Sequence, residues 1–102
     1  METYLVNVIK DRSMEVCNLK VIDDFVKDIN KKLEKYNYGF RIHITFKDNQ
    51  YFVKKHNVFS NREPYSETIH SFSDSDTYML HLYITGIYQG VLLNEWFKNS
   101  MY

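Results

Sequence analysis

The chain has 102 residues, and its 13 basic and 13 acidic side chains give a formal charge of zero at pH 7. This length predicts one domain, and balanced charge argues against a protein that binds polyanions over its whole surface. The single cysteine, Cys17, excludes an intramolecular disulfide, and no run of 18 apolar residues exists to span a membrane. The N-terminus has no basic-then-apolar leader, so we expect a cytoplasmic protein, with a nuclear one as the alternative.

The first predicted elements are a short strand and a long amphipathic helix. Residues 4–9 are mostly apolar and β-branched, which favours a strand. Between Asn18 and Gly39, apolar side chains recur at helical spacing and form one stripe: Ile22, Phe25, Val26, Ile29, Leu33 and Tyr36. We expect the rest of the chain to pack on this stripe.

Residues 40–56 predict a β-hairpin. Apolar and polar residues alternate from Phe40 to Lys47, and Asp48-Asn49 suits a two-residue turn because both residues tolerate a positive φ. The pairs that this turn predicts are Phe46–Tyr51 and Ile44–Val53 on the inner face, and Thr45–Phe52, His43–Lys54 and Arg41–His56 on the outer face.

The second half of the chain has a weaker pattern. Residues 57–76 are either a functional loop or a loop that hides a strand near residues 68–72. Residues 77–85 alternate again, which predicts a strand that buries Leu80 and Leu82, and residues 87–101 predict a short helix, with a further strand as the alternative. The order β-α-β-β-(loop)-β-α predicts a single α+β domain over residues 1–102. In this fold, an antiparallel sheet of three to five strands packs on one long amphipathic helix.

The composition suggests a protein that binds another protein. Aromatic residues make up 17% of the chain and include nine tyrosines, which are common contact residues of interfaces, although codon bias of an AT-rich genome explains them equally well. Residues 57–76 combine four acidic residues with apolar residues that follow no core pattern. The predicted partner-binding residues are Phe59, Glu63, Tyr65, Glu67, Phe72, Asp74, Asp76 and Tyr83.

In size, in its Asn/Lys/Ile/Tyr bias and in its lack of a catalytic constellation, the chain resembles small inhibitors carried by phages and other mobile elements, including anti-CRISPR proteins. That resemblance implies a non-catalytic protein that blocks a partner's surface in the host cytoplasm. The outer face of Thr77 to Thr85 is the next candidate surface, as the edge of a homodimer.

Nucleic-acid binding through the hairpin is the first alternative. From residue 40 to residue 62, five basic residues stand against one acidic residue. Arg41, His43, Phe52 and Lys54 share the outer face of the hairpin, where the cations could grip phosphates while a base stacks on the phenyl ring. The order of elements also resembles the double-stranded-RNA-binding domain. However, residues 86–90 lack the basic residues with which that family contacts phosphates.

Phosphodiester hydrolysis is the second alternative. His43-Ile44-Thr45 resembles the hydrophobic-His-x-Thr strand of the two-histidine phosphoesterase family, and His81-Leu82-Tyr83 would be its second copy, with Tyr where the family has Thr or Ser. The resemblance implies His43 and His81 as catalytic base and acid. The four histidines have no metal-ligand spacing and no phosphate-binding loop is present, so we expect no metal, no cofactor and no catalytic activity.

Overall fold

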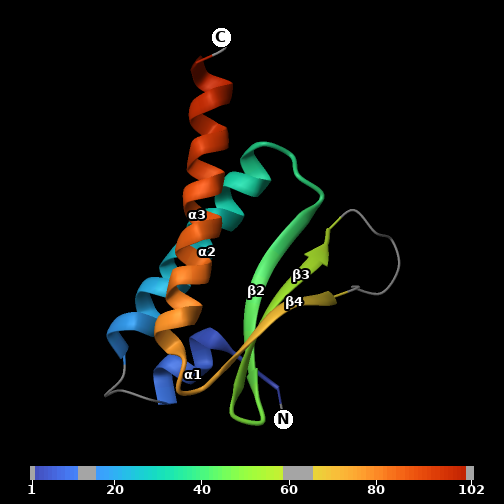
Figure 1. The fold of residues 1–102 in the computed structure, drawn as a ribbon. Coiled ribbons are helices and arrows are strands. Elements are labelled where there is room, and N and C mark those ends of the chain that lie inside the picture. Colours follow the sequence, from blue (N-terminus) through green and yellow to red (C-terminus); the bar gives the residue numbers. More distant parts are fainter. Residues whose placement is uncertain (1, 12–15, 59–65, 101–102) are drawn as a thin grey trace.

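Two layers, a sheet and a pair of long helices, make up the protein (Figure 1). The structure is a computed structural model and describes residues 2–11, 16–58 and 66–100. Its elements are β1 (Thr3–Tyr4), α1 (Leu5–Asp11), α2 (Val16–Lys35), β2 (Phe40–Lys47), β3 (Gln50–Asn57), β4 (Ser66–Ser73) and α3 (Thr77–Ser100). The four strands form one antiparallel sheet in the order β1-β2-β3-β4, so the predicted α+β class with an antiparallel sheet is confirmed.

The hairpin of β2 and β3 has the predicted register. Asp48 and Asn49 form the turn with φ values of 53° and 59°. All five predicted cross-strand pairs are present, including Ile44 opposite Val53 and His43 opposite Lys54. Because side chains alternate along a strand, this register sends Ile42, Ile44 and Val53 toward the helices and sends His43 to the other face.

Helix α2 is the predicted amphipathic helix. Its apolar stripe is buried from Leu19 to Leu33, while most of its lysines and two of its four acids, Asp24 and Glu34, are exposed. The helix ends where Asn37 adopts a left-handed conformation with φ of 65°, which lets the Tyr38 amide donate to the Leu33 carbonyl oxygen at 2.9 Å. The chain then turns directly into β2.

The predicted strand at residues 4–9 is mostly wrong. Only Thr3 and Tyr4 pair with β2, and Leu5–Asp11 forms the short helix α1. Leu5 and Val8 are buried and Ile9 packs beside them. The three residues are spaced three and four apart, so a helix brings all of them to the core where a strand would not.

The predicted strand at residues 77–85 is also wrong. These residues begin α3, which continues without a break through the predicted short helix to Ser100. The fourth strand is instead Ser66–Ser73, so of the two alternatives left open for residues 57–76, the structure has the strand near residues 68–72. Leu80 is fully buried as predicted, but Leu82 is 45% exposed because it lies on the opposite side of the helix.

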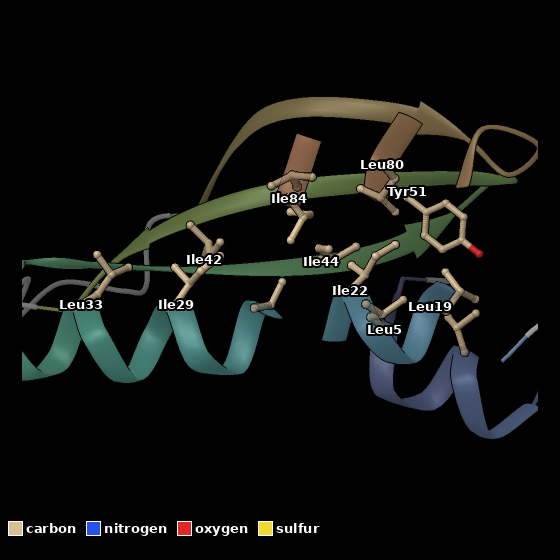
Figure 2. Close-up of a cluster of buried hydrophobic side chains, with 13 residues drawn as sticks. Leu5, Leu19, Ile22, Ile29, Leu33, Ile42, Ile44, Tyr51, Leu80 and Ile84 are labelled. Atoms are coloured by element: carbon tan, nitrogen blue, oxygen red, sulfur yellow. The ribbon is translucent and has the colours of Figure 1, made fainter. Parts of the chain in front are cut away.

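The core lies between the sheet and the parallel helices α2 and α3 (Figure 2). The chain reverses direction four times between the helices, once at each junction from α2 through β2, β3 and β4 to α3, which is why α3 runs in the same direction as α2 (Figure 1). The buried hydrophobic residues are Leu5, Val8, Leu19, Ile22, Val26, Ile29, Leu33, Ile42, Ile44, Tyr51, Val53, Leu80 and Ile84. Within the described ranges, no helix is both long enough and apolar enough to cross a membrane.

The open edge of β2 is closed by a side chain of α2. Strand β1 pairs only with Thr45 and Phe46. Beyond it, the Asn30 amide nitrogen donates to the Ile42 carbonyl oxygen at 2.8 Å, and the Ile42 amide donates to Asn30 Oδ1 at 2.9 Å. The carboxamide therefore takes the place of a neighbouring strand and joins α2 to the sheet.

Candidate interaction surface

Helix α3 is apolar on two opposite sides. Its inner side, with Leu80, Ile84, Ile87 and Val91, packs on the core. On the opposite side, six residues that follow one another three or four positions apart are all exposed. We call this set the outer stripe, and it consists of Tyr78, Leu82, Gly86, Gln89, Leu93 and Trp96.

The large residues of the outer stripe are among the most exposed hydrophobic side chains described in this protein. Tyr78, Leu82, Leu93 and Trp96 are between 45% and 65% exposed, and Met79 beside them is 52% exposed. A helix that is hydrophobic all round is typical of a buried helix, whereas a surface helix has polar residues on its outer face. On α3, which borders solvent, the outer stripe instead carries two exposed apolar pairs, one at each end of a short neutral centre, and exposed apolar surface of this kind marks interaction sites.

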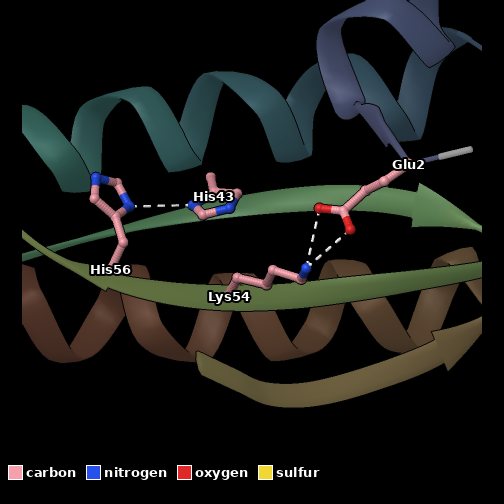
Figure 3. Close-up of polar contacts among 4 residues, drawn as sticks. All are labelled: Glu2, His43, Lys54 and His56. Carbon is pink, nitrogen blue, oxygen red and sulfur yellow. Dashed lines mark hydrogen bonds and ion pairs between the residues drawn. The ribbon is translucent and has the colours of Figure 1, made fainter. Parts of the chain in front are cut away.

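The opposite face of the sheet carries a second cluster, which is polar (Figure 3). Lys54 Nζ lies 3.0 Å and 3.1 Å from the two carboxylate oxygens of Glu2. This contact holds the pKa of Glu2 below its ordinary value, through the hydrogen bond from the ammonium and its positive charge. With Tyr4 and Ser66, these residues line a hollow of about 400 Å³.

Two histidines complete the polar cluster. His43 Nδ1 and His56 Nδ1 are 3.1 Å apart, so one ring donates the hydrogen and the other accepts it (Figure 3). Burial lowers the pKa of His43, and the neighbouring His56 and Lys54 lower it further. Chemically, the cluster offers one ion pair and one shared proton. Among the described residues, no group of three or more His, Cys, Asp or Glu side chains could hold a metal ion.

The residues predicted to grip nucleic acid do share this face, but their charges are engaged. The Arg41 guanidinium donates to the Tyr38 and Phe40 carbonyl oxygens at 2.9 Å and 2.7 Å. Lys54 is paired with Glu2, and Phe52 is half-buried. Two of the expected phosphate-binding cations are therefore already bound within the protein.

The predicted histidine pair is not assembled. His43 lies on β2 beside Tyr4, with ring centroids 5.7 Å apart, on the face of the sheet away from the core. His81 lies on α3 in the helix layer, where its ring is 6.2 Å from that of Phe25. The two rings are on opposite sides of the sheet and do not face one cleft.

The predicted partner-binding residues are dispersed. Phe59, Glu63 and Tyr65 lie outside the described residues. Glu67 is exposed on β4, and Asp74 and Asp76 lie in the turn that joins β4 to α3. The Asp76 carbonyl oxygen accepts from the Leu80 amide at 3.1 Å, so this acid begins α3, where a negative charge suits the helix dipole.

The two predicted aromatic residues in described segments, Phe72 and Tyr83, come together. Their ring centroids are 5.5 Å apart, and His70 stacks on Phe72 with centroids 4.4 Å apart. Both side chains are half-buried and pack on the core. Their contacts join β4 to α3, so both side chains have a structural role within the domain.

Sequence reasoning did not assign Leu93 or Trp96 to a binding surface, although Trp96 contributed to the spacing that predicted the short helix, and it placed Leu82 on the buried side of a strand. The signal that could have found them is the unbroken stretch of residues 77–100, which contains no proline and repeats apolar residues three and four apart on two sides. Comparison of the chain with known protein families, with curated proteins and with solved structures finds no match. The interpretation of this surface therefore depends on its own physical chemistry.

Proposed function

We propose that this protein is a non-catalytic interaction protein that binds another polypeptide through the outer stripe of α3. The observation that carries the proposal is the position of Tyr78, Leu82, Leu93 and Trp96 on one exposed side of a single helix. Inhibition of a host defence system, the role that size and composition suggest, is one form of this function.

The stripe contains the residue types from which interfaces draw most of their energy. Tryptophan and tyrosine are enriched at the few positions that dominate binding, and complete burial of one large apolar side chain stabilises a complex by about 1.5–3 kcal/mol. Trp96 and Leu93 lie within one turn of each other, as do Tyr78 and Leu82. A helical or groove-shaped partner could cover both pairs at once.

The two alternatives have less support from the contacts described above. Phosphate binding by the hairpin would require Lys54 to leave Glu2 and Arg41 to leave its carbonyl oxygens. Histidine catalysis would require His43 and His81 to meet across the sheet. Binding through α3 has the support that the large residues of the stripe are already exposed on a regular helix.

Site-specific photocrosslinking tests the proposal. A photoreactive amino acid at Leu93 should form an adduct with a polypeptide in nuclease-treated extract of the native host. The same group at exposed Lys31 on α2 is the matched control and should form none. Unlabelled wild type should compete for the adduct, and the Leu93→Glu variant should not, because a carboxylate on this face opposes desolvation. Equal labelling from both positions, or none from Leu93, would refute the proposal.

A further inference from the structure

The residues of the outer stripe follow nearly the same order in both directions along α3. We infer that it binds the α3 helix of a second copy of this chain in an antiparallel, two-fold pair. This inference rests on the proposed function, since it assigns the partner of the same surface. It follows from the order of the residues along the stripe, from a glycine at its centre and from its size.

The stripe is nearly the same when it is followed in either direction. Leu82 and Leu93 lie at equal distances from a point between Ile87 and Tyr88. The aromatic residues Tyr78 and Trp96 lie at equal distances from Ile87. An antiparallel two-fold pair brings position i of one copy against the equally distant position of the other. Leu82 would then contact the second copy's Leu93, and Tyr78 would contact its Trp96.

The centre of the stripe is small and neutral. Gly86 is exposed, its φ is not positive, and an added Cβ would meet nothing within 4 Å. Glycine in a helix interior is less favourable than alanine, so a residue without a side chain here is not explained by this copy's own packing. Where two helices cross, however, glycine lets their backbones approach closely. Gly86 and Gln89 are the residues that a two-fold axis at this centre would place together.

The surface has the charge and the size that a self-association requires. The outer stripe contains no charged residue, so two copies bring no like charges together. The exposed parts of its four large residues and Met79 amount to roughly 600 Å² per copy, or about 1,200 Å² for a pair, which reaches the lower limit of stable interfaces. The C-terminal end of α3 also projects beyond the sheet and α2 (Figure 1). In an antiparallel pair, each projecting end would lie along the other copy's Tyr78 end.

Sedimentation equilibrium of the purified protein is the first test. The wild type should show a monomer–dimer equilibrium in the micromolar range, as expected for an interface of this size. Leu93→Glu should weaken it by about a hundredfold or more, because the carboxylate would be buried without a partner. The matched control is Val21→Glu, which places the same charge at an apolar residue of α2 that is 39% exposed, and it should leave the equilibrium unchanged.

A charge exchange tests the antiparallel arrangement. Leu82→Lys and Leu93→Glu should each be monomeric alone. Their equimolar mixture should dimerise, because one contact becomes an ion pair and the other remains Leu82 against Leu93. A parallel pair would bring each introduced charge against leucine and would not recover. The mixture of Leu82→Lys with Leu82→Glu is the control that a parallel pair would rescue.

The outcomes separate this inference from the proposed function. A wild type that stays monomeric into the millimolar range overturns the second-copy inference. If Leu93 of that monomer still crosslinks to a foreign polypeptide, the proposed function stands; if it does not, both fall. Dimerisation that Leu93→Glu leaves unchanged would place the interface elsewhere and would also overturn the inference. Circular dichroism of each variant should retain the wild-type helical signal, so loss of the dimer would not reflect unfolding.

Discussion

The two long helices lie side by side on the same face of the sheet, yet their outer sides differ. On α2, the side away from the core carries exposed charged residues such as Lys20, Asp24 and Lys31. On α3, the corresponding side carries Tyr78, Leu82, Leu93 and Trp96. Burial of one stripe in the core explains all of α2 but only half of α3. The exposed apolar side of α3 is not explained by packing within the single domain.

The seam between the helices shows that they are nonetheless one layer. Phe25 stacks on Tyr88, with centroids 4.7 Å apart and planes 16° from parallel. The Tyr88 hydroxyl donates to Asp28 Oδ2 at 2.5 Å, a contact that raises the pKa of Tyr88. Lys32, one turn beyond Asp28 on α2, pairs at 3.0 Å with Glu95, which lies two turns beyond Tyr88 on α3. The contrast between the helices therefore concerns their outer sides only.

The largest expected effect separates the two sides of α3. Ile84 is completely buried, so Ile84→Ala should lower the free energy of unfolding by about 2–5 kcal/mol, the range for large-to-small core changes. Ile29→Ala on α2 should have a similar effect. Leu93→Ala is the control on the outer stripe and should change stability by less than about 0.5 kcal/mol. Urea denaturation at low protein concentration measures all three, and a large loss for Leu93→Ala would show that the stripe is part of the monomer's core.

The next prediction compares the loss of one asparagine side chain from each helix. Asn30→Ala should cost about 1–3 kcal/mol, because it leaves the Ile42 amide and carbonyl without their partner at a partly buried sheet edge. Asn94 on α3 donates to the Tyr38 hydroxyl at 2.7 Å but is exposed, so Asn94→Ala should cost less. Hydrogen exchange of the Ile42 amide should rise in the first variant only. Unchanged protection there would mean that the edge of β2 does not depend on Asn30.

The same comparison explains which elements could be predicted from the sequence. Helix α2 was predicted because its charged outer side makes the 3.6-residue period visible at Ile22, Val26, Ile29 and Leu33. The hairpin was predicted because one face of β2 is buried and the other is polar, and because Asp48 and Asn49 allow only a tight turn. In both cases one side of the element is apolar and the other is polar, and this difference made the period visible in the sequence.

Where that contrast is missing, the prediction failed. Residues 78–85 of α3 are apolar on both sides, so their pattern fits a strand as well as a helix. Strand β4 has the opposite difficulty, since nearly all of its residues are exposed and Phe72 alone is half-buried. The candidate surface was missed for the same reason as the helix. In sequence, an exposed apolar stripe on a helix has the same pattern as a second core stripe.

A smaller effect, of opposite sign, is expected at the centre of the outer stripe. Gly86→Ala should stabilise the monomer by about 0.5–1 kcal/mol, because alanine has the higher helix propensity and its Cβ would meet nothing within 4 Å. Thermal unfolding at low concentration measures the gain. The matched control is Lys31→Ala on the outer side of α2, where one good helix former replaces another and little change is expected. A loss of stability in Gly86→Ala would mean that the position needs glycine within the single copy.

The smallest effect concerns the ion pair that joins the two helices. The hydrogen bond from Lys32 holds the pKa of Glu95 below its ordinary value of 4.5, and the charge of that ammonium adds to the effect. The unfolded state therefore binds the proton first as the pH falls. Stability from this pair is complete above the ordinary pKa and is lost as the pH falls through the pKa of the folded state.

Glu95→Gln should accordingly weaken the acid dependence of the unfolding free energy while leaving the buried contacts of Ile84 in place. Glu34→Gln, which changes an exposed acid of α2 in the same way, is the control. If both variants follow the wild-type pH profile, the pair between α2 and α3 does not contribute to the stability of the layer, and the contacts of Tyr88 and the shared core hold the two helices together.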